Sequence, residues 1–204
     1  MNPLMKPMWI AAAMSALLAF CGMIAPAYAD VGVEIENASR ARVDVIWASP
    51  SAFQGTFLWP DNASASQEFD LIDSGNGFYR IKARHSGQCL MLDWRGGTYQ
   101  NGTKVIQYPY CYANYAPAEW FTQWVWRPNG CTGECFSFGS WYALIKNRAT
   151  GRCLDADNGA GGFPPYQSVL QQWDCIPSST EWNAFNQLWS FTVPTSEYVP
   201  PVIH

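Results

Sequence analysis

The chain has 204 residues, of which 14% are charged and 16% are aromatic, and its formal net charge is −4. Low charge together with many aromatic side chains excludes a disordered chain, and the length is sufficient for one well-packed domain or two small ones. The acidic balance, with no cluster of Lys or Arg, argues against binding to nucleic acid, because phosphate contacts need concentrated positive charge.

The first 29 residues have the features of a secretory signal peptide. A single charge at Lys6 precedes an apolar stretch from Met8 to Phe20, and Ala27-Tyr28-Ala29 offers a signal peptidase a small-x-small site. The apolar stretch is shorter than the roughly 20 residues that cross a bilayer. We therefore expect a secreted or periplasmic protein that does not insert into the membrane. A lipoprotein linked at Cys21 is the minority alternative, because Phe20 stands where such a signal has a small residue.

Six cysteines follow the signal peptide, and an even number in an exported chain predicts three disulfides. Six cysteines allow fifteen pairings, but two pairs share a spacing of 22 positions. This spacing favours the pairs Cys89–Cys111, Cys153–Cys175 and, for the remaining two, Cys131–Cys135. The last pair flanks a short loop without a nearby His or second cysteine pair, so a disulfide that staples the loop is favoured over a zinc or redox site.

The residues around the two equally spaced pairs repeat at an offset of 64 positions. The matched segments are Gly87-Gln88-Cys89-Leu90 with Gly151-Arg152-Cys153-Leu154, Val105-Ile106-Gln107 with Val169-Leu170-Gln171, and Phe121-x-Gln123 with Phe185-x-Gln187. Similarity at one fixed offset is the signature of an internally repeated architecture. We call the segments containing these two cysteine pairs copy two and copy three.

A fainter copy one precedes them at an offset of 46. Val43 and Asp61 fall on its two cysteine positions, so this copy is expected to lack the disulfide. It keeps Trp59, and Gln67-Glu68-Phe69 stands where the other copies have Gln-x-aromatic. Three copies therefore account for nearly the whole chain after the signal peptide.

Short apolar runs separated by Gly, Asn, Asp and Pro predict β-strands. Examples are Phe78–Ala83, Cys89–Asp93, Lys104–Tyr108 and Phe121–Trp126. Side chains alternate over four to six residues in such runs, and after the signal peptide no stretch keeps a helical period. Three copies of about four strands predict an all-β, threefold, closed fold, since closure hides the sheet edges.

Copy three resembles one repeat of the ricin B-type lectins, a β-trefoil family whose three repeats each carry Gln-x-Trp. The resemblance rests on Gly151-x-Cys153-Leu154-Asp155, Gly161-Gly162, Val169-x-Gln171-x-Trp173-x-Cys175 and Asn186-Gln187-x-Trp189. It extends over roughly Val31 to Val193. With the signal peptide at 1–29 set aside, the resemblance implies a β-trefoil lectin domain at 30–193, followed by an extended tail at 194–204.

The resemblance also implies a sugar site in each intact repeat. In copy three the corresponding residues are Asp155, Gln171, Trp173, Asn186 and Gln187, while Trp189 is expected in the core. The chemistry of these side chains agrees with this assignment. A sugar has an apolar face and a rim of hydroxyls, and a flat ring with a few fixed polar groups is complementary to both.

The other two copies depart from the pattern of the sugar site. In copy two, Met91 replaces the Asp, Pro109 the stacking aromatic and Thr122 the Asn. In copy one, Val45 falls on the Asp position, while Asp44 is one place away and is expected to face the other side, because strand side chains alternate. We therefore expect one competent sugar site, in copy three.

The sequence gives no support for a metal site, a cofactor or catalysis. Asp155-x-Asp157 resembles the opening of a calcium loop, but Tyr166 stands where that loop needs a bidentate Glu. The two histidines, His85 and His204, lie in a turn-like segment and at the chain end, with no sign of a Ser-His-Asp arrangement. We expect no enzymatic activity.

The expected function is that of a secreted lectin that binds galactose-type or related glycans. One alternative is the glycan-binding subunit of a multi-component bacterial toxin, because cytolethal distending toxin subunits resemble this chain in layout. In that case the tail at 195–204 would lie along a partner subunit. A further alternative, disfavoured by the intact set in copy three, is a trefoil that has lost sugar binding and acts as an inhibitor.

Overall fold

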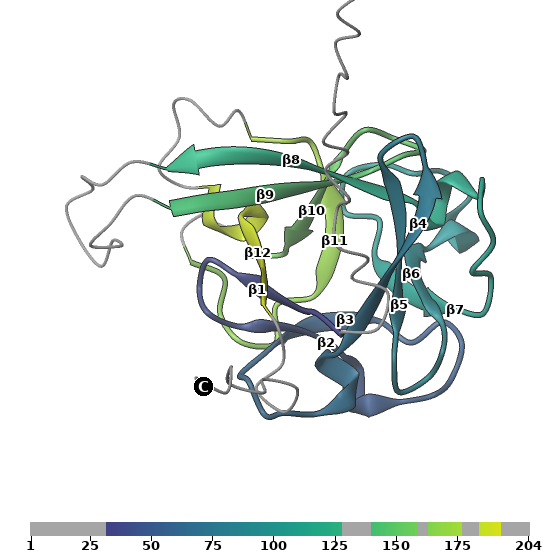
Figure 1. Ribbon diagram of the computed structural model, residues 1–204, viewed down its shortest axis with the longest axis horizontal. Coiled ribbons are helices and arrows are strands. Elements are labelled where there is room, and N and C mark those ends of the chain that lie inside the picture. The colour runs from purple at the N-terminus through teal and green to yellow at the C-terminus, as the bar shows by residue number, and fades with distance from the viewer. Residues whose placement is uncertain (1–31, 128–139, 159–162, 177–183, 193–204) are drawn as a thin grey trace, which may run out of the picture.

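The computed structural model of the protein describes residues 32–127, 140–158, 163–176 and 184–192 (Figure 1). Its strands are β1 Glu34–Asn37, β2 Arg42–Val45, β3 Thr56–Trp59, β4 Phe69–Gly75, β5 Phe78–Ala83, β6 Cys89–Leu92, β7 Val105–Tyr108, β8 Trp120–Arg127, β9 Ser140–Asn147, β10 Cys153–Ala156, β11 Leu170–Trp173 and β12 Trp189–Thr192. Short 3-10 turns are η1 Ile46–Ala48, η2 Ala65–Gln67, η3 Trp94–Gly96, η4 Ala116–Ala118 and η5 Ala184–Gln187. The predicted signal peptide, the Cys131–Cys135 pair and the tail lie outside the described residues.

The strands are paired as in a β-trefoil, and this confirms the predicted fold class. Strands β1, β4, β5, β8, β9 and β12 form a closed barrel, in which β4 pairs with β5, β8 with β9 and β12 with β1. The ring closes where the first and fourth strands of each copy meet, at Val33–Phe69, Tyr79–Trp120 and Ala143–Trp189. The other six strands form the hairpins β2–β3, β6–β7 and β10–β11 (Figure 1). Copies one, two and three are therefore β1–β4, β5–β8 and β9–β12.

Each copy contributes one large aromatic ring to the core of the barrel. Phe69, Trp120 and Trp189 are fully buried at the start of β4, β8 and β12. The indole N–H of Trp120 donates to the Leu90 carbonyl at 3.0 Å, and that of Trp189 donates to the Leu154 carbonyl at 3.1 Å. A buried indole needs such a partner, and the predicted core position of Trp189 is confirmed.

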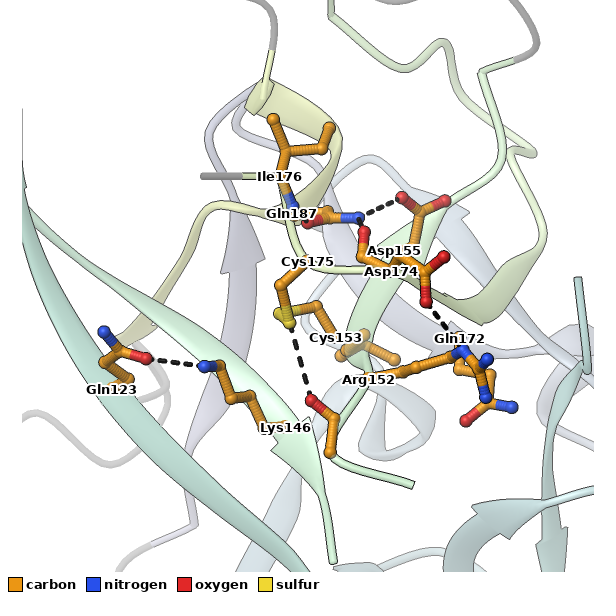
Figure 2. Close-up of a disulfide and its surroundings, with 12 residues drawn as sticks. Gln123, Lys146, Arg152, Cys153, Asp155, Gln172, Asp174, Cys175, Ile176 and Gln187 are labelled. Atoms are coloured by element: carbon orange, nitrogen blue, oxygen red, sulfur yellow. Dashed lines mark hydrogen bonds and ion pairs between the residues drawn. A yellow bond between two sulfur atoms is a disulfide. The ribbon is translucent and has the colours of Figure 1, made fainter. Parts of the chain in front are cut away.

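The alignment of the end of copy two with copy three was wrong. The counterpart of Gln187-x-Trp189 is Ala118-x-Trp120, and not Phe121-x-Gln123, because Trp120 and Trp189 make the same core contact. Trp120 follows Cys111 by nine positions, whereas Trp189 follows Cys175 by fourteen, so a fixed offset of 64 fails after the second cysteine. Gln123 lies exposed on β8, where its side chain accepts a hydrogen bond from Lys146 at 2.6 Å (Figure 2).

The hairpin register also corrects the match of Gln107 with Gln171 that was made from the sequence. Leu90 lies opposite Gln107 and Leu154 lies opposite Gln172, so the counterpart of Gln107 is Gln172 and not Gln171. The connection between the hairpin strands is one residue longer in copy three than in copy two. A slip of one residue moves a side chain to the opposite face of the sheet, and Gln107 accordingly bonds the Ser49 and Ser51 carbonyls.

An ion pair replaces the disulfide in copy one. The predicted disulfides Cys89–Cys111 and Cys153–Cys175 are present, with Cα atoms 5.3 and 5.0 Å apart. Arg42 lies opposite Trp59 just as Cys153 lies opposite Trp173, so Arg42, and not Val43, takes the first cysteine position. Its guanidinium lies 3.5 Å from Asp61, the residue predicted at the second position.

Candidate functional site

Three of the five predicted site residues surround the buried carboxylate of a fourth, Asp155, in copy three. Asp155 is 3% exposed. Its Oδ1 accepts a hydrogen bond from Gln171 Nε2 at 3.1 Å, and its Oδ2 accepts hydrogen bonds from Asn186 Nδ2 at 2.7 Å and Gln187 Nε2 at 2.8 Å. Figure 2 shows the contact between Gln187 and Asp155 beside the Cys153–Cys175 disulfide.

Local structure explains why these residues meet. Asp155 and Gln171 are directly opposite each other in the β10–β11 hairpin, on one face of the pair. Asn186 and Gln187 come from η5, the short turn that leads into β12. Trp173 is two residues after Gln171, so its indole lies on the same side of β11, where it is 43% exposed. The structure thus brings all five predicted residues to one place.

The carboxylate of Asp155 keeps capacity for a further hydrogen bond. Burial raises the pKa of Asp155, while the amides of Gln187 and Gln171 oppose this shift. An ionised carboxylate has about four acceptor positions, and three are used by the amides. The buried Oδ1 of Asn186 has no hydrogen-bond partner within the described part of the chain. One acceptor position on Asp155 and the Oδ1 of Asn186 are therefore not used by the described residues.

Sequence reasoning missed one residue of this site, Lys104. Its ammonium lies 3.2 Å from Gln171 Oε1 and 3.5 Å from Asp157 Oδ2. Lys104 belongs to copy two, directly before β7, and reaches the site because its backbone bridges to Gln171. No local sequence pattern predicts a contact between residues 67 positions apart.

Copy one holds a second, partial cluster, and the prediction that Asp44 faces away is wrong. Arg42 takes the first cysteine position, so Asp44 is the counterpart of Asp155. Its carboxylate is buried and accepts hydrogen bonds from Gln67 Nε2 at 3.0 Å and from Ser66. The turn before β2 is one residue shorter than in the other copies, and this shift brings Asp44, and not Val45, to the Asp position.

The copy-one cluster differs from that of copy three on one side. Phe57 lies opposite Asp44 where copy three has Gln171. Trp59 is the counterpart of Trp173, and its ring stacks on Phe57 with centroids 5.4 Å apart and an interplanar angle of 29°. Burial raises the pKa of Asp44, as it does for Asp155. Copy one thus combines a hydrogen-bonded carboxylate with an aromatic ring, but it has one amide and one hydroxyl donor where copy three has three amides.

Copy two has no carboxylate in this position. Met91, fully buried, occupies it as predicted, and Ile106 lies opposite. The aromatic position belongs to Tyr108, and not to Pro109, because Tyr108 lies opposite Cys89. Its ring packs against Trp94 with centroids 4.6 Å apart. Copy two therefore presents an aromatic surface in place of a polar cluster.

The remaining candidates from the sequence are the histidines, of which His204 lies outside the described residues, and a metal site. His85 is half-buried, with its Nε2 3.1 Å from the Ser49 carbonyl oxygen. Among the residues that the structure describes, no group of three or more His, Cys, Asp or Glu side chains is arranged to hold a metal ion. Within the same residues, no helix is long and apolar enough to span a membrane.

Comparison with known proteins gives a partial family match. A model of the ricin-type β-trefoil lectin domain-like family matches residues 28–108. This part of the chain is therefore similar to the ricin-type β-trefoil lectin-like family. The match covers copy one and strands β5 to β7, whereas the resemblance seen in the sequence is carried by copy three. A search of curated proteins finds no match.

Solved structures of other β-trefoil proteins superpose on this chain. ThreeFoil, a designed threefold-symmetric protein, is 22% identical over 78% of this chain and 96% of its own, with a TM-score of 0.59. A chain of the cytolethal distending toxin of Actinobacillus actinomycetemcomitans is 15% identical over 86% of this chain and 99% of its own, with a TM-score of 0.59.

A third neighbour is the Polyporus squamosus lectin bound to Neu5Acα2-6Galβ1-4GlcNAc. It is 16% identical over 80% of this chain and 49% of its own, with a TM-score of 0.55. At these identities the likeness establishes the β-trefoil fold alone.

Proposed function

We propose that this protein is a secreted, non-catalytic lectin whose principal glycan site is the Asp155 cluster of copy three. One observation carries the proposal: Asp155 is buried among three amide donors, next to a half-exposed indole on Trp173 and to Asn186, whose Oδ1 has no partner among the described residues. A buried carboxylate is costly unless it has partners. This arrangement suits a neutral sugar, whose hydroxyls donate to the acceptors while its apolar face covers the ring.

Export and ligand class belong to the same proposal. The signal-peptide features of residues 1–29 and the two disulfides support an oxidising location outside the cytoplasm. We take galactose-type glycans as the first ligands to test.

A glycan array tests the proposal directly. The oxidised protein without residues 1–29 is applied to an array of galactose-, N-acetylgalactosamine-, xylose- and sialic acid-terminated glycans. Asp155→Asn is compared with Asp73→Asn, a matched change at an exposed aspartate near the end of β4. We expect binding by wild type and Asp73→Asn, and loss of at least about tenfold for Asp155→Asn. A folded wild-type protein that binds no glycan would contradict the proposal.

A second candidate function is the glycan-binding subunit of a multi-component toxin. The observation that favours it is the superposition on a cytolethal distending toxin chain over 99% of that chain's length. Such a subunit needs a separately encoded enzyme. Co-expression with the products of adjacent genes, followed by size-exclusion chromatography, tests this directly. A stable complex with an enzyme would favour the toxin subunit, and a chain that elutes alone would favour the lectin.

A further inference from the structure

A turn of copy two lies against the exposed indole of copy three. In the turn formed by residues 100–103, the backbone N–H of Gly102 donates to the Gln172 carbonyl at 2.9 Å, and that of Gln172 donates to the Thr103 carbonyl at 2.8 Å. A Cβ atom on Gly102 would lie 3.8 Å from Cζ3 of Trp173, so the turn passes directly beside the indole.

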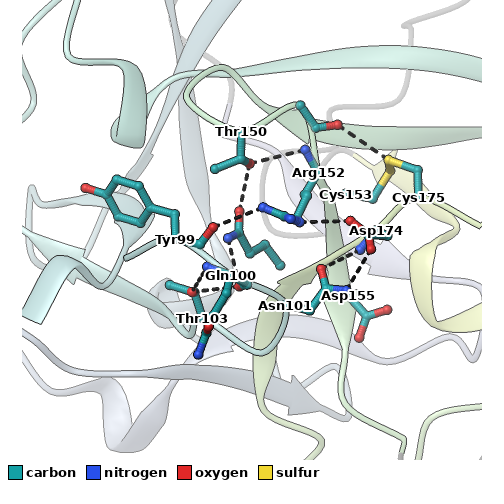
Figure 3. Close-up of polar contacts among 12 residues, drawn as sticks. Tyr99, Gln100, Asn101, Thr103, Thr150, Arg152, Cys153, Asp155, Asp174 and Cys175 are labelled. Atoms are coloured by element: carbon teal, nitrogen blue, oxygen red, sulfur yellow. Dashed lines mark hydrogen bonds and ion pairs between the residues drawn. A yellow bond between two sulfur atoms is a disulfide. The ribbon is translucent and has the colours of Figure 1, made fainter. Parts of the chain in front are cut away.

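Side-chain hydrogen bonds fasten this turn to the residue after the indole (Figure 3). Asn101 Nδ2 donates to Asp174 Oδ2 at 2.8 Å, and Asn101 Oδ1 accepts the backbone N–H of Asp174 at 2.9 Å. Arg152 Nε donates to the other carboxylate oxygen, Asp174 Oδ1, at 2.9 Å. The hydrogen bonds from Asn101 and Arg152 hold the pKa of Asp174 below its usual range.

Asp174 is also tied to the buried carboxylate of the site. Gln187 Nε2 donates to the backbone carbonyl of Asp174 at 3.1 Å and to Asp155 Oδ2 at 2.8 Å (Figure 2). Asp174, the residue after Trp173, is therefore held from one side by copy two and from the other by the same amide that binds Asp155.

The other two copies make the backbone contact without the side-chain pair. Phe53 and Gln167 donate to the carbonyls of Gln107 and Leu58, just as Gly102 does to that of Gln172. All three donors have positive φ, at 66°, 71° and 85° respectively. The counterparts of Asn101 are thus Ala52 and Tyr166, and those of Asp174 are Pro109 and Pro60. Within the described residues, the trefoil needs this turn in every copy but carries the Asn–Asp pair only beside the complete glycan cluster.

We propose that Asn101 and Asp174 are positioning residues of the glycan site, which hold the indole of Trp173 at a fixed place relative to Asp155. The site then spans two copies of the trefoil. An exposed aromatic side chain loses conformational freedom when it stacks on a ligand, and a ring fixed beforehand loses less. The inference rests on the glycan-binding function proposed above.

Reciprocal exchange of the two side chains tests the inference. Asn101→Asp sets two carboxylates against each other, and Asp174→Asn sets an amide against Asn101 or Arg152. In the double variant, the carboxylate at position 101 accepts hydrogen bonds from the backbone N–H and from the side-chain amide N–H of residue 174. The side-chain amide oxygen of residue 174 still accepts a hydrogen bond from Arg152. The double variant therefore restores all three hydrogen bonds with the partners reversed.

Concentration series of wild type and the three variants are run on the glycan array described above, with urea unfolding as a parallel measurement. We expect each single variant to bind roughly tenfold more weakly or worse, and the double variant to return to within about threefold of wild type. Single variants that bind as wild type does would overturn the positioning role. A double variant as weak as the singles at unchanged stability would overturn it too. A wild-type protein that binds no glycan overturns the proposed function itself, so the two failures are distinct.

Discussion

The Asp155 and Asp44 clusters each stabilise a buried carboxylate by hydrogen bonds from neighbouring side chains. Asp155 has three amide donors, while Asp44 has Gln67 and Ser66. Hydrogen bonds to the charged form offset part of the cost of removing it from water, but burial is the larger effect in both residues and raises both pKa values. The polar residues are therefore maintained at some cost in stability, which is typical of a functional site.

Asp155 should give the unfolding free energy a measurable pH dependence. Its folded pKa is raised above the unfolded value of about 3.9, so protonation favours the folded state. The contribution of Asp155 to stability thus falls as pH rises from about 4 to the folded pKa and is constant above it. As pH rises through that interval, the unfolding free energy of Asp155→Asn should increase relative to that of wild type. Urea unfolding followed by circular dichroism measures both. A difference between the two proteins that does not change with pH would refute the shift.

The two tryptophans of copy three should separate stability from binding. Trp189 is fully buried with its N–H paired, so Trp189→Ala should lower the unfolding free energy by about 3–5 kcal/mol. Trp173 is 43% exposed, so Trp173→Ala should change stability by less than about 1 kcal/mol while abolishing glycan binding. Urea unfolding and the glycan array measure the two effects. Equal losses of stability would show that Trp173 has a core role.

At the scale of elements, each hairpin is fastened to the segment that follows it, but the chemistry differs between copies. Disulfides do this in copies two and three, and each should contribute roughly 3 kcal/mol by the loop-entropy estimate. In copy one, Arg42 pairs with Asp61 and also with Glu34 at 2.8 Å, where both side chains are largely buried. Copy one therefore depends on charge pairing and is insensitive to reductant.

Removal of the Arg42 guanidinium should destabilise the protein strongly. Arg42→Met leaves Glu34 buried without its ion-pair partner, and a broken buried pair costs about 3–5 kcal/mol. Arg95→Met is the matched control, because Arg95 is 52% exposed and its pair with Asp93 should contribute no more than about 1 kcal/mol. Urea unfolding under oxidising conditions compares the two. Similar losses for both variants would show that Arg42 is not essential to copy one.

At the scale of the whole molecule, the threefold barrel places two carboxylate clusters on one scaffold. They lie in copies one and three, at counterpart positions in the hairpins β2–β3 and β10–β11. Two weak sites on one rigid protein raise the apparent affinity for a surface that carries many glycans. If the proposed lectin function holds, the partial cluster at Asp44 raises the apparent affinity for such a surface even when its own affinity for a glycan is low.

Avidity provides the test of the copy-one cluster. On a densely printed array, Asp44→Asn should reduce apparent affinity by roughly tenfold or more, whereas on a sparsely printed array it should have little effect. Asp155→Asn should reduce binding on both. Identical behaviour of Asp44→Asn and wild type at high density would show that Asp44 is a structural carboxylate.

The sequence by itself determined the strands, the internal repeat, two disulfides and the set of candidate site residues that lie together in copy three. Each of these is encoded by short-range spacing: alternation along a strand, the 22-residue interval between cysteines, and the interval of two between Gln171 and Trp173. Strand predictions such as Phe78–Ala83 and Cys89–Asp93 agreed with β5 and β6 to within one residue.

Only the tertiary structure decided the register between copies and the contacts across them. Because the turn before β2 is one residue shorter, Asp44, and not Val45, takes the position of Asp155. An alignment of the copies at one fixed offset cannot detect this. Contacts such as Asn101 with Asp174 join residues 73 positions apart, and Lys104 reaches Gln171 over 67. Such pairs are adjacent because barrel closure seats each hairpin against the next copy, which depends on the geometry of the whole sheet and not on any local pattern.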